Sequence, residues 1–243
     1  MDKLIDKQIG QIVADDYRTA SVFKNYGIDF CCNGNRSIQE ACEKKGLAYD
    51  KIILELESVA INNSSDTTDY STWPLDLLAD YVEKKHHRYV ENRIPELKAY
   101  LSKIRKVHGD RHPELIEIEE QFNASAGDLT MHMKKEEIML FPYIRKMVTT
   151  PKNSKNGEAP HFGTVKNPIQ MMMHEHNVEG DRFRKISELS DNYNPPKDAC
   201  NTYKVAFSML KEFEDDLHLH IHLENNILFP KAIEMEQKLA LNN

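Results

Sequence analysis

Apolar residues beyond residue 73 recur at steps of three and four positions, which is the period of an amphipathic helix. The pattern predicts four long helices, at roughly 74–107, 113–148, 167–190 and 198–237, and four such helices predict an antiparallel bundle. Glycine and proline are sparse, with 9 and 10 among 243 residues. No long stretch alternates between apolar and polar residues as a strand would. The fold class predicted is therefore all-α.

A polar stretch at residues 63–73, rich in Asn, Ser, Asp and Thr, interrupts the periodicity and indicates a linker. It divides the chain into a small helical domain at residues 1–62 and the bundle at residues 74–243.

Within the small domain, one helix is expected from about Ile9 to Tyr26, ended by Gly27. A second helix is expected to begin at a capping box formed by Ser37 and Glu40. The loop between them carries two adjacent cysteines, Cys31 and Cys32.

A motif in the second long helix is repeated in the fourth. His132 and Glu136 stand four residues apart and are followed by Leu-Phe-Pro, as are His220 and Glu224. Residues four apart lie one turn apart on the same face of a helix. Both pairs fall in the apolar seam, where a buried carboxylate without a partner is costly. The Leu-Phe-Pro that follows each pair is expected to pack and to end the helix.

The first and third helices each place one histidine in the seam. On the first helix the inward residue is His87, and the neighbouring His86 points elsewhere. The third helix has a seam of Ile169, Met173, His176, Gly180 and Phe183, so that His176 is inward and His174 is displaced. Each of the four helices is thus expected to contribute one inward histidine.

Four histidines and two glutamates in one core layer point to a metal site. Imidazole and carboxylate together suit iron, manganese or zinc, and two carboxylates are able to bridge two cations. A single buried histidine is more often a satisfied core residue than a ligand. Six inward polar residues with a duplicated spacing favour a metal site instead, because leaving all six unpaired in the core would be costly.

Composition excludes several other functions. A formal charge of −7 and the lack of a basic stripe argue against nucleic acid as a partner. The N-terminus has no apolar core typical of a secretory signal, and no apolar run approaches membrane-spanning length. Four cysteines, two of them adjacent, do not form a typical disulfide framework. We therefore expect a cytoplasmic protein with no membrane partner.

These motifs resemble those of a known family. The duplicated His-x-x-x-Glu with Leu-Phe-Pro, the His-His-x-Tyr-Val-x-x-x-Ile-Pro around His87 and the Glu-His at residues 175–176 are similar to those of the hemerythrin-like RIC proteins, which repair iron centres. The segment Tyr-Gly-Ile-Asp-Phe-Cys-Cys-Asn-Gly-Asn at residues 26–35 resembles the short ScdA-type domain of the same family. The resemblance covers nearly the whole chain.

The resemblance implies a hemerythrin-like bundle that holds two non-haem iron ions with oxo and carboxylate bridges. It implies a homodimer that serves iron-sulfur proteins damaged by nitric oxide or peroxide, by supplying iron. The ligands it implies are His87, His132, His176 and His220, with Glu136 and Glu224 as bridges. Acidic residues along a channel to the metals correspond to Glu175 and Asp128.

Two alternatives remain open at this stage. One is an enzyme that reduces nitric oxide to nitrous oxide at the two irons, and the other is a sensor or carrier of O2 or nitric oxide. Oxygen-carrying hemerythrins resemble this chain less, because they have a further histidine on the third helix where this sequence has Gly180. Fewer protein ligands leave open positions for small molecules and favour release of iron.

The two adjacent cysteines suggest a second functional site, separate from the metal site. A thiol in a loop just before a helix N-terminus can have a lowered pKa, which would make Cys31 or Cys32 a nucleophile or a metal-receiving thiolate. We expect this pair to serve in redox chemistry, metal transfer or partner contact. The alternative is that one thiol is simply buried and the other idle.

Overall fold

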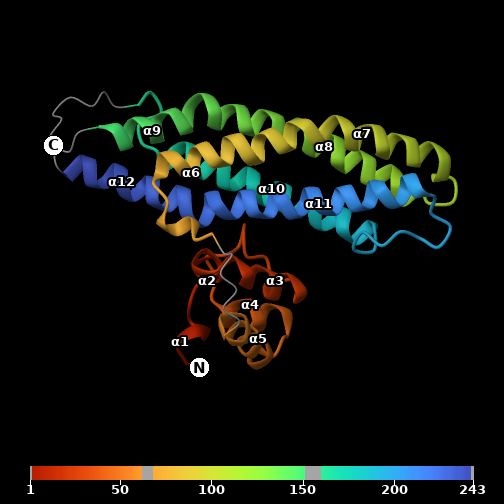
Figure 1. Ribbon diagram of the computed structural model, residues 1–243, viewed down its shortest axis with the longest axis horizontal. Coiled ribbons are helices and arrows are strands. Elements are labelled where there is room, and N and C mark those ends of the chain that lie inside the picture. Colours follow the sequence, from red (N-terminus) through yellow and green to blue (C-terminus); the bar gives the residue numbers. More distant parts are fainter. Residues whose placement is uncertain (1, 62–67, 151–159, 242–243) are drawn as a thin grey trace.

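A long helical bundle with a small helical domain against one side makes up the structure (Figure 1). The computed structural model describes residues 2–61, 68–150 and 160–241. Helices account for every regular element in these ranges, apart from one isolated β-bridge between Gln8 and Ser37. The all-α prediction is therefore confirmed. Among the described residues, no helix is long and apolar enough to cross a membrane.

The four long helices of the bundle lie close to their predicted positions, and three of them contain a short π-helical segment. The first consists of α6 (Leu75–Tyr81), η3 (Val82–His87) and α7 (Arg88–His108). The second consists of α8 (Glu114–Lys135), η4 (Glu136–Leu140) and α9 (Phe141–Thr149). The third is α10 (Lys166–Leu189). The fourth consists of α11 (Asn201–Leu223), η5 (Glu224–Leu228) and α12 (Phe229–Leu241).

The π segments explain why the repeated Leu-Phe-Pro does not end a helix. Pro142 and Pro230 are each the second residue of the α-helix that follows a π segment. The hydrogen-bond pattern changes at that point, so that a residue without an N–H is tolerated as it is at a helix start. The expectation that these prolines terminate the helices was wrong, because α9 continues to Thr149 and α12 to Leu241.

The small domain consists of five α-helices and a 3-10 turn. They are α1 (Asp2–Ile5), α2 (Ile9–Asp15), η1 (Tyr17–Thr19), α3 (Ala20–Asn25), α4 (Ile38–Lys45) and α5 (Tyr49–Ile61). The single helix expected from Ile9 to Tyr26 was wrong. Asp16 is extended, at φ −152° and ψ 101°, and its carboxylate accepts the backbone N–H of Arg18, which starts the 3-10 turn.

Other local predictions for this domain hold. Gly27 has a left-handed φ of 61° just after α3, where only glycine is unstrained. The capping box at the start of α4 is present, because the side chain of Ser37 accepts the N–H of Glu40 and the side chain of Glu40 accepts the N–H of Ser37.

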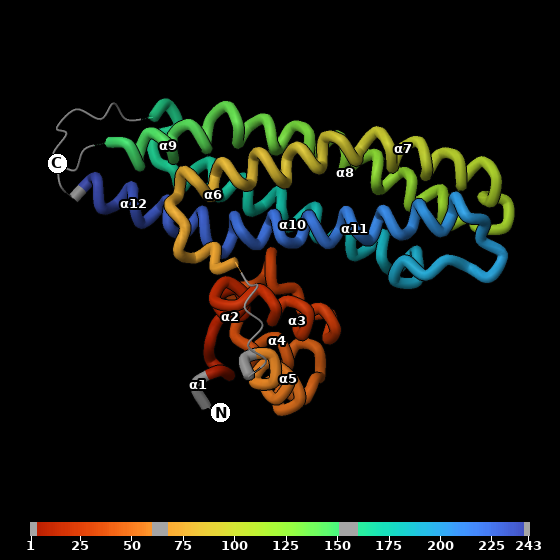
Figure 2. The backbone as a smooth tube through the Cα atoms, viewed as in Figure 1, coloured from red at the N-terminus to blue at the C-terminus, as the bar shows by residue number. Residues whose placement is uncertain are grey.

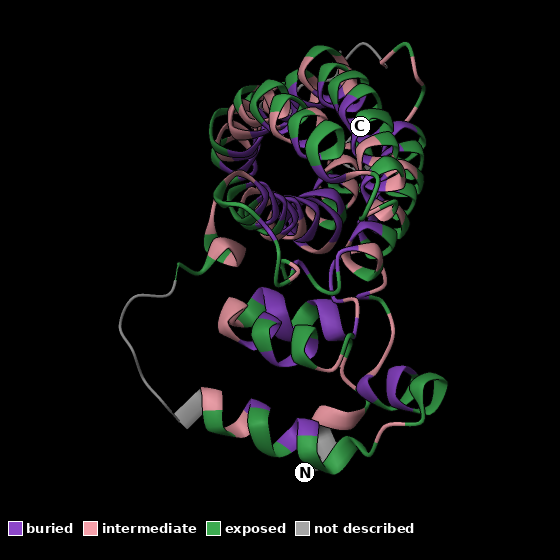
Figure 3. Ribbon diagram, turned by 90° about the vertical axis from the view of Figure 1, so that its right-hand side faces the viewer, coloured by how far each residue is buried: buried purple, intermediate pink, exposed green. Residues whose placement is uncertain are grey.

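The interior of the bundle is apolar at both ends and polar between them. The residues coloured as buried lie on the inner faces of the bundle helices (Figure 3). One apolar cluster includes Phe122, Phe183 and Phe213, with ring centroids 5.4 Å and 5.6 Å apart. The other includes Phe141 and Phe229. On α10, however, Met173 is 37% exposed and Met172 is fully buried, so the predicted seam was wrong at that position.

The small domain contacts the bundle near α10 and α11 (Figure 2). Asn226 of η5 donates through its Nδ2 to the backbone oxygen of Phe30 at 3.2 Å. Gly10 and Gly34 leave the space that this side chain occupies, because an added Cβ at Gly10 would lie 2.2 Å from the Asn226 Oδ1. The two glycines therefore allow the bundle to insert a side chain into the small domain.

Part of the predicted linker is structured. Residues 63–67 lie outside the described residues. The remainder contains the 3-10 turn η2 (Tyr70–Thr72), and the Tyr70 ring lies 5.0 Å from that of Trp73 and 5.4 Å from that of Tyr81. The chain is thus anchored on the bundle before α6 begins.

Replacing Gly10 by alanine should loosen the seating of the small domain. The new methyl group would displace the Asn226 amide, and we expect a loss of about 1–3 kcal/mol in the free energy of unfolding. Denaturant titration would measure it. Gly127→Ala on α8 is the matched control, since an added Cβ there meets no atom within 4 Å. Equal midpoints for the two variants would contradict this account of the interface.

Candidate metal centre

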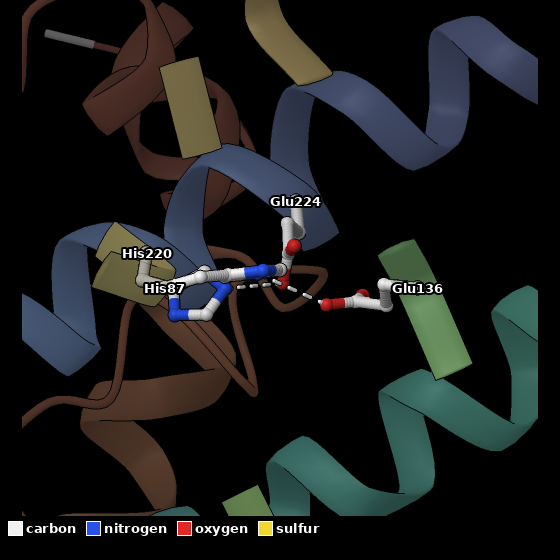
Figure 4. A group of neighbouring side chains, drawn as sticks. All are labelled: His87, Glu136, His220 and Glu224. Carbon is white, nitrogen blue, oxygen red and sulfur yellow. Dashed lines mark ion pairs between the residues drawn. The ribbon is translucent and has the colours of Figure 1, made fainter. Parts of the chain in front are cut away.

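Six polar side chains meet in the middle of the bundle, and all are buried. They form two groups in which the ligand atoms lie within 4.8 Å of one another, and both groups contain Glu136 and Glu224. The first group adds His87 and His220 to the glutamates, and these four side chains point toward one another (Figure 4). The second group is completed by His132 and His176. Because the two groups share both carboxylates, each group has the donor set for a metal ion and the two ions would have the carboxylates in common.

The duplicated motif positions these side chains in the same way in both helices. His132 lies near the end of α8 and Glu136 opens η4, just as His220 lies near the end of α11 and Glu224 opens η5. A π turn has one extra residue, so it changes the direction of the following side chains. His87 ends the π segment of the first helix, and α10 supplies the remaining histidine from an uninterrupted helix.

The ligand atoms lack other partners. Both carboxylate oxygens of Glu136 and of Glu224 are buried without a hydrogen bond, as are the Nε2 atoms of His87 and His220. The His132 and His176 Nε2 atoms face each other at 3.0 Å. The nearest imidazole nitrogens lie 3.1–3.4 Å from the Oε2 atoms of the glutamates. Buried groups of this kind need compensation, and two cations fit the donor set.

The two glutamates differ in their pKa. Burial, with the nearby charge of Glu224, raises the pKa of Glu136 well above its usual range. Burial also disfavours the charged form of Glu224, but His220 and His176 outweigh it and hold its pKa well below the usual range. The negative charge of Glu224 is therefore balanced within the layer, whereas Glu136 is held in its neutral form and becomes ionised only when positive charge is supplied from elsewhere.

The protonation state of two of the histidines favours metal binding. Burial lowers the pKa of His87 to about 2 and that of His132 to about 4. Both are therefore neutral at physiological pH, which is the form that ligates metals. His220 differs, because Glu224 raises its pKa against the effect of burial. A metal ion bound there would take the place of that proton.

Most of these histidines are oriented through their second ring nitrogen. The Nδ1 atom lies 3.2 Å from Glu137 Oε1 in His87, 2.8 Å from Glu175 Oε2 in His132 and 2.9 Å from Asn225 Oδ1 in His176. The His220 Nδ1 has no hydrogen-bond partner within the part of the chain that the structure describes. Such contacts fix the tautomer and direct Nε2 at the metal. The spacing of the motif did not predict these roles of Glu137 and Asn225, although each directly follows a glutamate of the motif.

A cavity of about 270 Å³ leads to the second group from the outside of the bundle. It is bounded by α8 and α10, and its walls include His132 and His176. Both residues expected along a channel, Glu175 and Asp128, line this cavity. Glu175 contacts His132 directly, and this hydrogen bond lowers the pKa of the Glu175 carboxyl to about 2. Asp128 pairs with Arg182 at 2.9 Å.

His86 contradicts the expectation that it points away from the core. It is fully buried, its Nδ1 lies 3.0 Å from Asp216 Oδ1, and its ring is stacked on that of His220 with centroids 5.7 Å apart. The physical reason is η3, which disturbs the helical period at this point and turns two successive histidines inward. His174 is exposed, as predicted.

The cysteine loop of the small domain lies directly against α10. The Cys32 Sγ donates to the backbone oxygen of His176 at 3.3 Å. Asp29 accepts the backbone N–H groups of Cys31 and Cys32 at 3.1 Å and 2.9 Å. The expectation of a lowered thiol pKa was wrong for Cys31, because its contact with Cys32 and its burial raise that pKa well above the usual range. Asp29 and the two thiols also lie close enough to share a metal ion.

Comparison with known proteins covers both parts of the chain. Residues 5–60 match ScdA_N, a domain of unknown function, and residues 79–232 match the hemerythrin HHE cation binding domain. The iron-sulfur cluster repair protein YtfE of Pectobacterium atrosepticum is 34% identical over 232 residues, which cover 95% of this chain and 98% of that protein. The iron-sulfur cluster repair protein ScdA of Staphylococcus haemolyticus is 30% identical over 223 residues, covering 92% and 96%.

Replacing either shared glutamate should reduce metal binding. In Glu136→Gln or Glu224→Gln, the neutral amide cannot bridge two cations, so we expect fewer than two irons to remain per chain. Iron would be measured colorimetrically after anaerobic loading and gel filtration. Glu234→Gln on α12 is the control, because its side chain is 61% exposed. Retention of two irons in both glutamate variants would contradict the bridging assignment.

His86 and His174 should differ in their effect on stability. His86→Ala would leave a cavity and a carboxylate on Asp216 without its partner, which should lower the free energy of unfolding by about 2–4 kcal/mol. His174→Ala should stay within about 0.5 kcal/mol of the unmodified protein, because it is exposed. Chemical denaturation of the metal-free proteins measures both. Similar midpoints would refute the buried role of His86.

Proposed function

Because the chain belongs to the hemerythrin HHE family that includes the YtfE and ScdA iron-sulfur cluster repair proteins, we propose that it binds two irons in the bundle and supplies iron to damaged iron-sulfur proteins. The observation that carries the proposal is the duplicated group of buried histidine and glutamate atoms, of which those of Glu136, Glu224, His87 and His220 have no hydrogen-bond partner among the described residues. A cavity leads to this group, and the cysteine loop lies against the helix that carries His176. The proposed ligands are His87, His132, His176 and His220, with Glu136 and Glu224 as bridges.

The donor set favours iron that can be released. Four imidazoles and two shared carboxylates give each metal few protein ligands, and Gly180, one turn after His176, supplies none. When bound, iron in such a site exchanges ligands and electrons readily. The protein's own contribution is to hold neutral imidazoles and to keep the carboxylates away from competing hydrogen-bond donors.

The cavity between α8 and α10 gives the proposed route to the metals. Lys135 and Glu175 form an ion pair in its wall, and Glu175 also holds His132. Motion of this pair would free a ligand histidine at the same time as it opens the cavity. Small molecules such as nitric oxide, O2 or peroxide would enter by the same path.

The thiols of Cys31 and Cys32 are proposed to receive iron or to contact the damaged client. The contact of the Cys32 thiol with the backbone oxygen of His176 on α10 supports this assignment. Because the pKa of Cys31 is raised, its thiol is protonated at neutral pH. Transfer of a metal ion to it therefore requires that the thiol proton leave as the metal arrives.

The test is transfer of labelled iron. The full chain, loaded anaerobically with an iron isotope, is mixed with a purified iron-sulfur hydratase whose cluster has been degraded by nitric oxide. We expect label to appear in the hydratase as its activity returns, and Glu224→Gln to transfer much less than Glu234→Gln. If nitrous oxide forms with turnover while no label moves, the chain is a reductase and the donor proposal fails.

A further inference from the structure

The residue that follows each shared glutamate differs between the two copies of the motif. It is Glu137 after Glu136 and Asn225 after Glu224. Each one orients a histidine of another helix through Nδ1, His87 in the first case and His176 in the second. A carboxylate only accepts hydrogen bonds, whereas an amide accepts through oxygen and donates through nitrogen. The second copy thus has a capacity that the first lacks.

Asn225 uses both ends of its amide. Its Oδ1 lies 2.9 Å from the Nδ1 of His176, and its Nδ2 donates to the backbone oxygen of Cys31 at 3.2 Å. The amide is therefore a direct link between a proposed metal ligand and the cysteine loop of the small domain. All three groups are buried, so that leaving any of them unpaired would be costly.

A second contact joins the same two segments. The Cys32 Sγ donates to the backbone oxygen of His176. One turn later on α10, a Cβ added to Gly180 would lie 3.1 Å from that sulfur. The glycine therefore makes room for the thiol, and the cysteine loop is seated on the turn that carries the ligand.

The direction of the amide depends on the state of His176. A metal on Nε2 requires the ring proton to be on Nδ1, so that Asn225 must present its oxygen to His176 and its NH2 group to Cys31. Without metal, the proton can move to Nε2, and the amide can then turn around to donate to Nδ1. Its oxygen would then face the backbone oxygen of Cys31, two acceptors would be opposed, and the loop would be less firmly held.

We propose that Asn225 is a positioning residue that couples metal binding at His176 to the seating of the Cys31–Cys32 loop. Metal in the second group holds the loop closed, and loss of metal loosens it, so that the thiols become accessible when iron leaves. Because such coupling is reciprocal, release of the loop also weakens metal binding at His176. The inference rests on the proposed metal site but not on repair of a client.

Two substitutions of Asn225 separate its two contacts. Asn225→Leu removes both. Asn225→Asp keeps an acceptor for His176 but loses the donor to Cys31. Glu137→Leu is the matched control, because it removes the corresponding acceptor from His87 in the other copy, away from the cysteine loop.

The experiment measures alkylation of each cysteine in the full chain, by peptide mass spectrometry, with and without anaerobic Fe²⁺. In the unmodified protein, Fe²⁺ should slow labelling of Cys31 and Cys32 about tenfold, and exposed Cys200 serves as the internal reference. In both Asn225 variants we expect fast labelling that Fe²⁺ does not change. In Glu137→Leu, Fe²⁺ should still protect the thiols.

Release of iron to a chelator is the second readout. Asn225→Leu and Glu137→Leu should each release iron about tenfold faster, since each loses the partner of one ligand histidine. Asn225→Asp should release iron faster than the unmodified protein but more slowly than Asn225→Leu, because the acceptor for His176 remains while the loop no longer supports it. The thiols are thus expected to react quickly in both Asn225→Leu and Asn225→Asp, although these two variants release iron at different rates.

Several outcomes would overturn the coupling. Protection by Fe²⁺ that persists in Asn225→Leu would mean that the thiols bind the metal themselves. Loss of protection in Glu137→Leu would mean that any weakening of the site has this effect. Circular dichroism and melting curves identify a variant that fails to fold, in which case Asn225→Asp decides. If iron-dependent protection is found but no iron reaches a client, the proposed function fails and the coupling stands.

Discussion

Two carboxylates buried among four imidazoles are the constraint on which the structure depends. Neither glutamate accepts a hydrogen bond from any residue that the structure describes, and an apolar cluster lies on each side of the polar layer. A bundle of this length would be more stable with aliphatic residues in that layer unless cations compensate the charge. The proposed binding of metal accounts for this layer, and the apolar ends of the bundle supply the stability that it lacks.

The geometry around the layer follows from that constraint. To bring side chains of four helices onto shared centres, three helices widen into π turns at the residues concerned, and each glutamate of the motif opens such a turn. The second ring nitrogens of three histidines are then held by Glu137, Glu175 and Asn225. Ligand direction thus depends on residues that do not themselves face the centre, as is usual for metal sites.

Much of the fold was predictable, because helical period and capping are local properties. The four long helices and the six inward residues were identified by phase alone, and the Ser37 capping box was found as expected. The errors have a common origin in local departures from that period. The π segment at residues 82–87 turned His86 inward, and the extended backbone of Asp16 divided a helix that looked continuous. Neither departure has a clear signal in single residues.

The contacts between the small domain and the bundle could not be predicted from the sequence, because they depend on how the two parts pack against each other. Nothing in the spacing places Cys32 over Gly180, or Asn226 between Gly10 and Gly34. Yet the same π segment, η5, carries Glu224 at its start and then the two asparagines that hold the backbone of the cysteine loop. One short stretch of helix therefore serves the metal centre and the domain interface together. Under the proposed coupling, a displacement of Glu224 on metal binding would reach Asn225 and Asn226, the next two residues of η5, and through their hydrogen bonds the backbone of Cys31 and Phe30.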